Sequence, residues 1–171
     1  PRRRAIIASA SSTGIGYSSS RRRRSARRDL MLSVAPPLSV MRTGMEAFPI
    51  LSPDGRELII GSGRNGASEL WRRPASGEGE ESHLWGSKRD CWPSSWSPDG
   101  RSILAICEAP EAGLDLWVVT PGADPPARPL IATSFTEDLP RFSPDGRMVV
   151  YVSDRSGEQE IYVQEFRDGA A

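Results

Sequence analysis

One pentapeptide occurs three times along this 171-residue chain, and it constrains the fold more than any other feature. Ser-Pro-Asp-Gly-Arg stands at residues 52–56, 97–101 and 143–147, so successive copies begin 45 and 46 residues apart. Chance does not repeat a pentapeptide at so constant a spacing, and a period of this length indicates a structural repeat. Each repeat is expected to form one small module that buries its apolar faces against its neighbours.

The repeated pentapeptide has the composition of a tight turn between two strands. Proline at the second position presets φ, aspartate bonds nearby backbone groups, and glycine adopts the positive φ that ends the turn. We expect a three-residue hairpin loop with the glycine at a bulge. The predicted turn residues are Ser52, Pro53, Asp54, Gly55, Ser97, Pro98, Asp99, Gly100, Ser143, Pro144, Asp145 and Gly146.

Nearly continuous apolar runs follow each turn, at residues 58–60, 103–106 and 148–152. Such runs are typical of strands that are covered on both faces. A polar loop, an aromatic-containing run and a more polar segment come next, which makes four short strands in each repeat of ~45 residues. No useful stretch has the 3.6-residue periodicity of a helical repeat. We therefore predict an all-β fold, an incomplete β-propeller of about three four-stranded antiparallel blades.

The expected blades cover residues 43–88, 89–134 and 135–171, and the third is incomplete because no outer strand follows its aromatic strand. Closed propellers hold at least four blades. The chain is therefore expected either to be a fragment of a longer propeller, which we favour, or to need partner chains on its end faces. An isolated chain should self-associate, because it would expose apolar blade faces and unpaired strand edges.

Residues 1–42 do not share the repeat. They hold ten arginines and one acid, Asp29, whereas residues 43–171 hold 12 basic and 21 acidic residues. This composition predicts a basic Ser/Arg-rich arm, disordered apart from a possible strand over residues 30–34. Such an arm could attract nucleic acid or anionic lipid, although a solvated arm is the simpler interpretation. No stretch has the apolar length of a membrane span.

No catalytic residue, cofactor site or metal site is predicted. His83 is the only histidine, and the sequence places no nucleophile beside it. Residues 61–66 fit G-x-G-x-x-G, but another strand follows them, so they indicate a hairpin loop and not a dinucleotide site. The acids of the repeated turn, Asp54, Asp99 and Asp145, are expected to serve turn geometry, because a calcium site needs several converging oxygens.

The two cysteines could face each other. With a three-residue loop after Ser97, Cys91 would lie opposite Cys107 across a hairpin, near the distance of a disulfide. Pro93, however, stands one residue further upstream of its turn than Pro49 and Pro140 do, and that extra residue could spoil the register. A disulfide therefore stays possible, although two unlinked cysteines are the interpretation that we favour.

Large aromatic and arginine side chains offer a possible interaction surface, because such residues dominate the energetics of protein interfaces. The alternative, which we prefer for Trp71 and the residues at its position in the other repeats, Trp117 and Tyr162, is packing between blades. The candidate surface residues are Trp71, Arg72, Arg73, Trp85 and Trp92.

The third repeat carries a family resemblance. Between Pro140 and Val163 the chain reads Pro-Arg-Phe-Ser-Pro-Asp-Gly-Arg, Val-Val-Tyr-Val-Ser-Asp-Arg-Ser-Gly and Glu-Ile-Tyr-Val. This resembles the TolB-type propeller repeat and, more narrowly, the propellers attached to bacterial transmembrane Ser/Thr protein kinases. The resemblance covers roughly residues 44–168. It implies a sensing or protein-interaction module without catalysis of its own, often outside the cytoplasmic membrane.

These observations predict a non-catalytic β-propeller segment that serves protein–protein interaction or ligand sensing within a larger TolB-like or kinase-linked protein. The alternative is the accessory propeller of an enzyme whose catalytic domain lies elsewhere, either a Ser/Thr kinase or a propeller-gated peptidase. The His-Arg-Asp and Asp-Phe-Gly motifs of kinases and the G-x-S-x-G motif of hydrolases do not occur in this chain.

Overall fold

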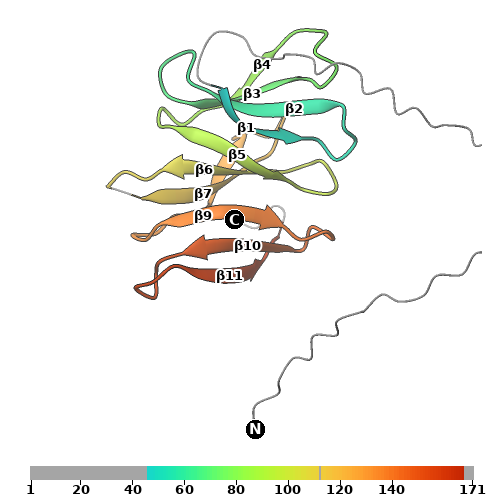
Figure 1. Ribbon diagram of the computed structural model, residues 1–171. Coiled ribbons are helices and arrows are strands. Elements are labelled where there is room, and N and C mark those ends of the chain that lie inside the picture. The colour runs from blue at the N-terminus through green and yellow to red at the C-terminus, as the bar shows by residue number, and fades with distance from the viewer. Residues whose placement is uncertain (1–45, 112, 168–171) are drawn as a thin grey trace, which may run out of the picture. The chain divides into compact units, whose positions relative to one another are not determined.

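The computed structural model describes residues 46–111 and 113–167, and these form strands and connecting loops (Figure 1). Each of the three sheets is antiparallel, and its strands are neighbours in chain order. The expected all-β fold is confirmed, and the third sheet has three strands within the described residues. The strands are β1 Glu46–Leu51, β2 Glu57–Ser62, β3 Glu69–Pro74 and β4 Ser82–Trp85 in the first sheet; β5 Cys91–Trp96, β6 Ile103–Glu108, β7 Leu114–Val119 and β8 Ala127–Ile131 in the second; and β9 Glu137–Phe142, β10 Met148–Ser153 and β11 Glu160–Glu165 in the third.

One predicted segment lies outside this range. The basic arm of residues 1–42, with its possible strand at 30–34, lies outside the described residues. In the part of the chain that is described, no helix is long and apolar enough to cross a membrane.

The repeated turn is held by the same hydrogen bonds in every copy. In the second copy, the Ser97 hydroxyl donates to Asp99 Oδ1 at 2.6 Å and accepts the backbone N–H of Ser102 at 2.9 Å. Asp99 Oδ1 also accepts the N–H of Arg101, and Gly100, with φ of 75°, donates to the Ser97 carbonyl. The corresponding bonds in the other two copies agree to within 0.1 Å. Serine, aspartate and glycine are therefore all needed by the turn itself.

The expected three-residue loop is wrong, because four residues separate the paired ends of each turn. Ser97 N–H donates to the Ser102 carbonyl, so the hairpin closes between those two residues. The serine hydroxyl accepts the N–H five residues further on, which favours closing the ladder there. A bulge then shifts the register by one residue between Pro93 and Ser95.

That bulge brings the two cysteines opposite each other. Ser94 is the extra residue in β5, and beyond it Cys91 pairs with Cys107. A disulfide joins the two side chains, whose Cα atoms are 4.1 Å apart, and both are buried. The bulge thus produces this pairing, because its one-residue shift offsets the longer loop, and β1 and β9 contain the same shift.

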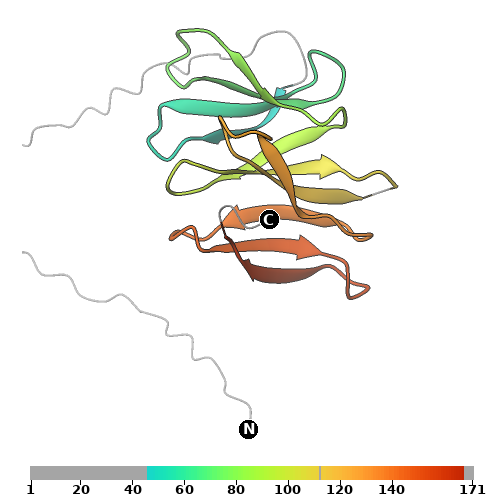
Figure 2. The same cartoon turned by 180° about the vertical axis from the view of Figure 1, so that it is seen from behind.

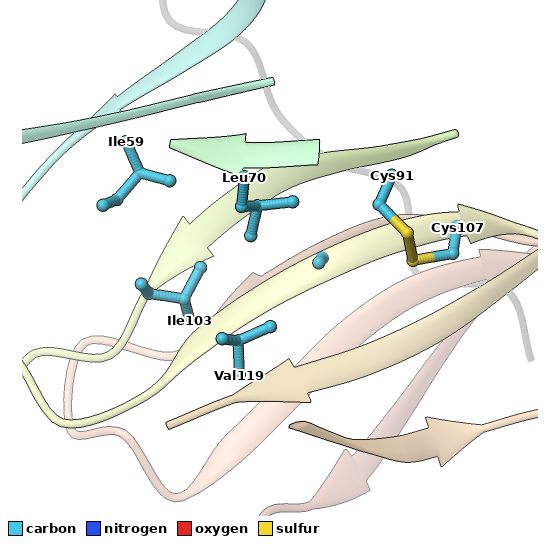
Figure 3. Packing of buried hydrophobic residues seen from close by; sticks show 7 residues of the cluster. Ile59, Leu70, Cys91, Ile103, Cys107 and Val119 are labelled. Carbon is cyan, nitrogen blue, oxygen red and sulfur yellow. A yellow bond between two sulfur atoms is a disulfide. The ribbon is translucent and has the colours of Figure 1, made fainter. Parts of the chain in front are cut away.

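The three sheets stack face to face, as the views from both sides show (Figures 1 and 2). Alternate residues of β6 point to opposite faces of the middle sheet. Ile103 and Ala105 pack against the first sheet with Ile59 and Leu70, as Figure 3 shows for the labelled members of this cluster. Leu104 and Ile106, together with Leu116 and Val118 of the same sheet, pack against Val149 and Tyr151 of the third sheet. Burial on both faces explains why the strands after each turn are nearly continuous apolar runs.

Replacing Ser97 by alanine should destabilise the chain by about 1–3 kcal/mol. The change leaves the buried N–H of Ser102 without its acceptor and removes the donor to Asp99. Urea unfolding measures the loss. The control is Ser76→Ala, which removes an exposed hydroxyl from a loop and should change stability by less than about 0.5 kcal/mol. Equal effects of the two changes would contradict this role of the serine.

The turn acids predict a loss of stability in acid. The serine hydroxyl and then the backbone N–H of the following arginine lower the pKa of Asp54, Asp99 and Asp145 below the usual value of 3.8. A carboxyl with a lowered pKa in the folded state stabilises the fold above its unfolded-state pKa. That stabilisation is lost as the pH falls from about 4 through the folded-state pKa. Urea unfolding as a function of pH should show a shallower acid loss in the triple Asp→Asn variant than in Glu78→Gln.

The disulfide predicts that alkylating reagents label neither cysteine unless a reductant is added, as mass spectrometry of unfolded protein would show. Replacing both Cys91 and Cys107 by alanine should lower stability by about 2–4 kcal/mol, because the bond closes a loop of moderate length. Labelling of both thiols without reductant, on protein made in an oxidising compartment, would contradict the bond.

Candidate functional site: an apolar groove along the first strands

The first strands of the three sheets, β1, β5 and β9, contact one another in series. Each contains the proline that the repeat places upstream of the turn, and each has a register shift near that proline. Pro93 and Pro140 are fully buried. Because a proline does not donate to the ladder, the strand bulges there and turns the preceding side chain away from the sheet.

The residue before the proline is large and apolar in all three strands: Phe48, Trp92 and Leu139. Phe48 and Leu139 are 59% and 56% exposed, although most side chains of this size are buried. Their backbones have φ of 55° and 52°, a conformation that costs a bulky residue about 1–2 kcal/mol. Strained, exposed apolar residues at equivalent repeat positions point to a function for this surface.

The side chains of Phe48 and Trp92 extend the surface across two sheets, with ring centroids 5.9 Å apart. Trp92 reaches this position because Gly61 of β2 has no side chain. A Cβ atom on Gly61 would lie 2.9 Å from Trp92 Cδ1, which is closer than packed atoms come. Glycine is therefore required here for close approach, in the segment that also fits G-x-G-x-x-G.

An arginine lies among these apolar groups and is held in place by the bulge of β5. Arg141 Nη1 donates to the Ser94 carbonyl at 2.7 Å and to the Pro140 carbonyl at 2.9 Å, and it also contacts Ser94 Oγ. Ser94 is the bulge residue of β5, so the carbonyl and hydroxyl of the neighbouring strand hold Arg141 together with the Pro140 carbonyl of its own strand. Arg141 is exposed, and its guanidinium presents a fixed positive charge beside the aromatic side chains.

Together these residues form an open groove with a volume of about 350 Å³. Its size lies at the lower end of the range of small-ligand and peptide-side-chain sites. Apolar side chains dominate it, and Asp138 and Arg141 supply one charge of each sign. The lining residues are Phe48, Pro49, Ile50, Trp92, Pro93, Ser94, Ile106, Leu114, Asp138, Leu139 and Arg141.

Of the five surface residues considered from sequence, the structure places Trp92 alone in this groove. Trp85 is half-buried between the first two sheets, with its ring 5.3 Å from that of Trp117. Arg72 is partly exposed and pairs with Glu57.

Trp71 and Arg73 lie together on the outer face of the first sheet, in an ionic cluster. Arg73 is buried and bridges Glu46 at 3.0 Å and Glu81 at 3.1 Å. Arg64 pairs with the same two acids and lies over the Trp71 ring, 4.3 Å from its centroid. The two arginines and two glutamates of this ionic cluster pair with one another, and together they lie on the outer face of the first sheet.

His83 is exposed at the edge of the first sheet. Its Nε2 lies 3.1 Å from Glu69 Oε2, and its ring meets Trp71 edge to face. Within residues 46–111 and 113–167, no three His, Cys, Asp or Glu side chains are placed to hold a metal ion.

Sequence reasoning missed Phe48, Leu139, Ser94 and Arg141. A signal was present, because the residue before each repeat proline is large and apolar. The role of Ser94 and Arg141 depends on contact between strands 47 residues apart, which no local pattern indicates.

The chain matches no family model and no curated protein sequence. Solved structures do match it. TolB from Acinetobacter baumannii superposes with a TM-score of 0.61 and 20% identity, over 77% of this chain and 32% of TolB. A putative TolB from Agrobacterium tumefaciens gives 0.52 and 19%, over 77% of this chain and 65% of the other. A prolyl endopeptidase gives 0.52 and 16%, over 71% of this chain and 20% of the enzyme.

These likenesses establish the fold, which is that of a TolB-like β-propeller, and the three sheets are its blades 1, 2 and 3. The chain spans about a third of the A. baumannii TolB chain.

Proposed function

We propose that this chain is a non-catalytic propeller segment that binds a protein or peptide partner, or a small ligand, in the groove along β1, β5 and β9. The observation that carries the proposal is the alignment of Phe48, Trp92 and Leu139, one from each blade, with two of them strained and more than half exposed. Aromatic side chains and arginine are the residues that most often dominate binding energy at interfaces.

The groove is also prepared for binding. Arg141 is held by backbone carbonyls, so little side-chain freedom is lost when it meets a ligand. The apolar walls bring the hydrophobic contribution, and the guanidinium selects for a carboxylate or a carbonyl beside an apolar group. An extended peptide with a large apolar side chain combines these features.

We further propose that the segment works as part of a larger propeller. Closed propellers hold four or more blades, and the described residues supply three. The outer side of blade 3 exposes Ile161 and Val163, which are 74% and 62% accessible. An apolar sheet face of this kind is typical of a surface that another element covers.

A second candidate is the accessory propeller of an enzyme, and the likeness to part of a prolyl endopeptidase favours it. In that case the catalytic groups would come from another domain. The coding region that flanks this sequence would distinguish the candidates, through a hydrolase or a kinase domain in the same reading frame.

The groove predicts selective capture of peptides. Phage-displayed peptides selected on the immobilised chain should be enriched in large apolar side chains. Replacing Phe48 and Leu139 together by serine should weaken binding of a selected peptide about 30-fold or more, in a fluorescence-polarisation titration.

The matched control is Phe135→Ser, which removes an exposed phenylalanine from a loop outside the groove. Peptides whose affinity is unchanged in the Phe48/Leu139 variant, or a selection that enriches nothing, would refute the groove as the binding site.

A further inference from the structure

The interface between blades 2 and 3 provides a template for the two outer faces of the chain. Blade 2 contributes Leu104, Ile106, Leu116 and Val118 to it, and we call these positions the trailing face of a blade. Blade 3 contributes Phe142, Val149, Tyr151 and Tyr162, the leading face. The whole interface is thus one trailing face packed on one leading face.

Blade 3 has a trailing face of the same kind, and none of the described sheets covers it. Val150 and Val152 stand seven and nine residues after the repeated serine, as Leu104 and Ile106 do in blade 2. Their strand partners Val163 and Ile161 correspond to Val118 and Leu116. Leu116 and Val118 are 0% and 1% exposed, whereas Ile161 and Val163 are 74% and 62% exposed. The two faces therefore carry similar apolar residues, and their exposure differs because a neighbouring sheet covers only the trailing face of blade 2.

Within the described residues, no blade packs on the leading face of blade 1. The residues Leu51, Leu58, Ile60 and Trp71 stand at the same distances from Ser52 as Phe142, Val149, Tyr151 and Tyr162 do from Ser143. Leu51 is 56% exposed, although Phe142 packs in the core between blades 2 and 3. Figure 1 shows blades 1 and 3 at the two ends of the stack, so the described part of the chain presents one leading and one trailing face.

The ionic cluster on blade 1 is compatible with a stacked neighbour. Its Arg64 lies over Trp71, and Arg155 lies over Tyr162 in the same way, 3.7 Å from the ring centroid. Tyr162 is part of the packed interface between blades 2 and 3, so a leading face can carry this arginine and still be covered. The acids of the cluster neutralise its arginines, which lowers the cost of covering them.

We propose that two copies of this chain associate head to tail, the trailing face of each blade 3 packing on the leading face of the other copy's blade 1. This proposal rests on the proposed function, which places the chain in a larger propeller, and it names the partner. Closed propellers hold typically four to eight blades. The described residues of one copy supply three blades, so two copies supply six and three copies supply nine, and two copies is the number that falls within this range. Both junctions repeat the packing already present within the chain.

Size-exclusion chromatography with light scattering on the 171-residue chain should give twice the single-chain mass of 18.7 kDa. Ile161→Lys and Leu51→Glu should each raise the dimer dissociation constant about 100-fold, because each places a charge in one of the two faces. Both side chains are exposed in one copy, so the variants should keep the circular dichroism of the parent chain. Phe135→Lys, at an exposed phenylalanine on neither face, should leave the dimer intact.

Mixing the two variants separates this arrangement from others. An Ile161→Lys chain and a Leu51→Glu chain together retain one unaltered junction, so the mixture should recover dimer that neither forms alone. A single-chain mass for the parent protein would overturn the proposal. Weaker dimerisation of Ile161→Lys with unchanged dimerisation of Leu51→Glu would also overturn it, because that result indicates contact between two blade 3 faces. A series of species larger than the dimer would overturn it as well. Peptide binding in the groove by a monomer would leave the proposed function standing, and loss of groove binding by an intact dimer would remove that function alone.

Discussion

Face-to-face packing of twisted sheets is the interaction on which this molecule depends. No sheet in the described part of the chain has a core of its own, because its apolar side chains alternate between two faces that only neighbouring sheets can cover. Blade 2 is covered on both sides, and its strand β6 is buried over residues Ile103–Cys107. The stability of the fold therefore comes mainly from the interfaces between blades, as in other repeat proteins. Each end blade makes one such interface within the described residues, whereas blade 2 makes two.

The turns give this stack its regularity. Each Ser-Pro-Asp-Gly-Arg closes on itself through the serine hydroxyl and the aspartate carboxylate, so it needs nothing from the neighbouring blades. Such a turn ends one strand and begins the next at a constant place. The faces of successive blades then carry residues at equivalent positions, as Phe142 and Leu51 do directly before the repeated serine.

The all-β fold and its repeated antiparallel sheets could be predicted from the sequence, because turn chemistry and apolar runs are local signals. The loop length could not, since it depends on the bond from Ser102 N–H to the Ser97 hydroxyl and not on composition. The facing of Cys91 and Cys107 came from a register that the longer loop and the extra Ser94 restore together. The groove could not be predicted because its residues come from three blades. Trp71 and Trp85 were candidate surface residues by their chemistry, but they lie against other sheet faces.

The arginine of β9 has a consequence for recognition. Identical modules arranged around an axis would offer a ligand several equivalent ways to lie, each rotated by one module. Arg141 breaks this equivalence, because Ile50 and Ser95 stand at its position in the other two blades, and the Ser94 carbonyl anchors it beside the apolar side chains. A bound molecule with one polar end then has a single preferred direction along the groove, so a repetitive scaffold acquires polarity from one arginine.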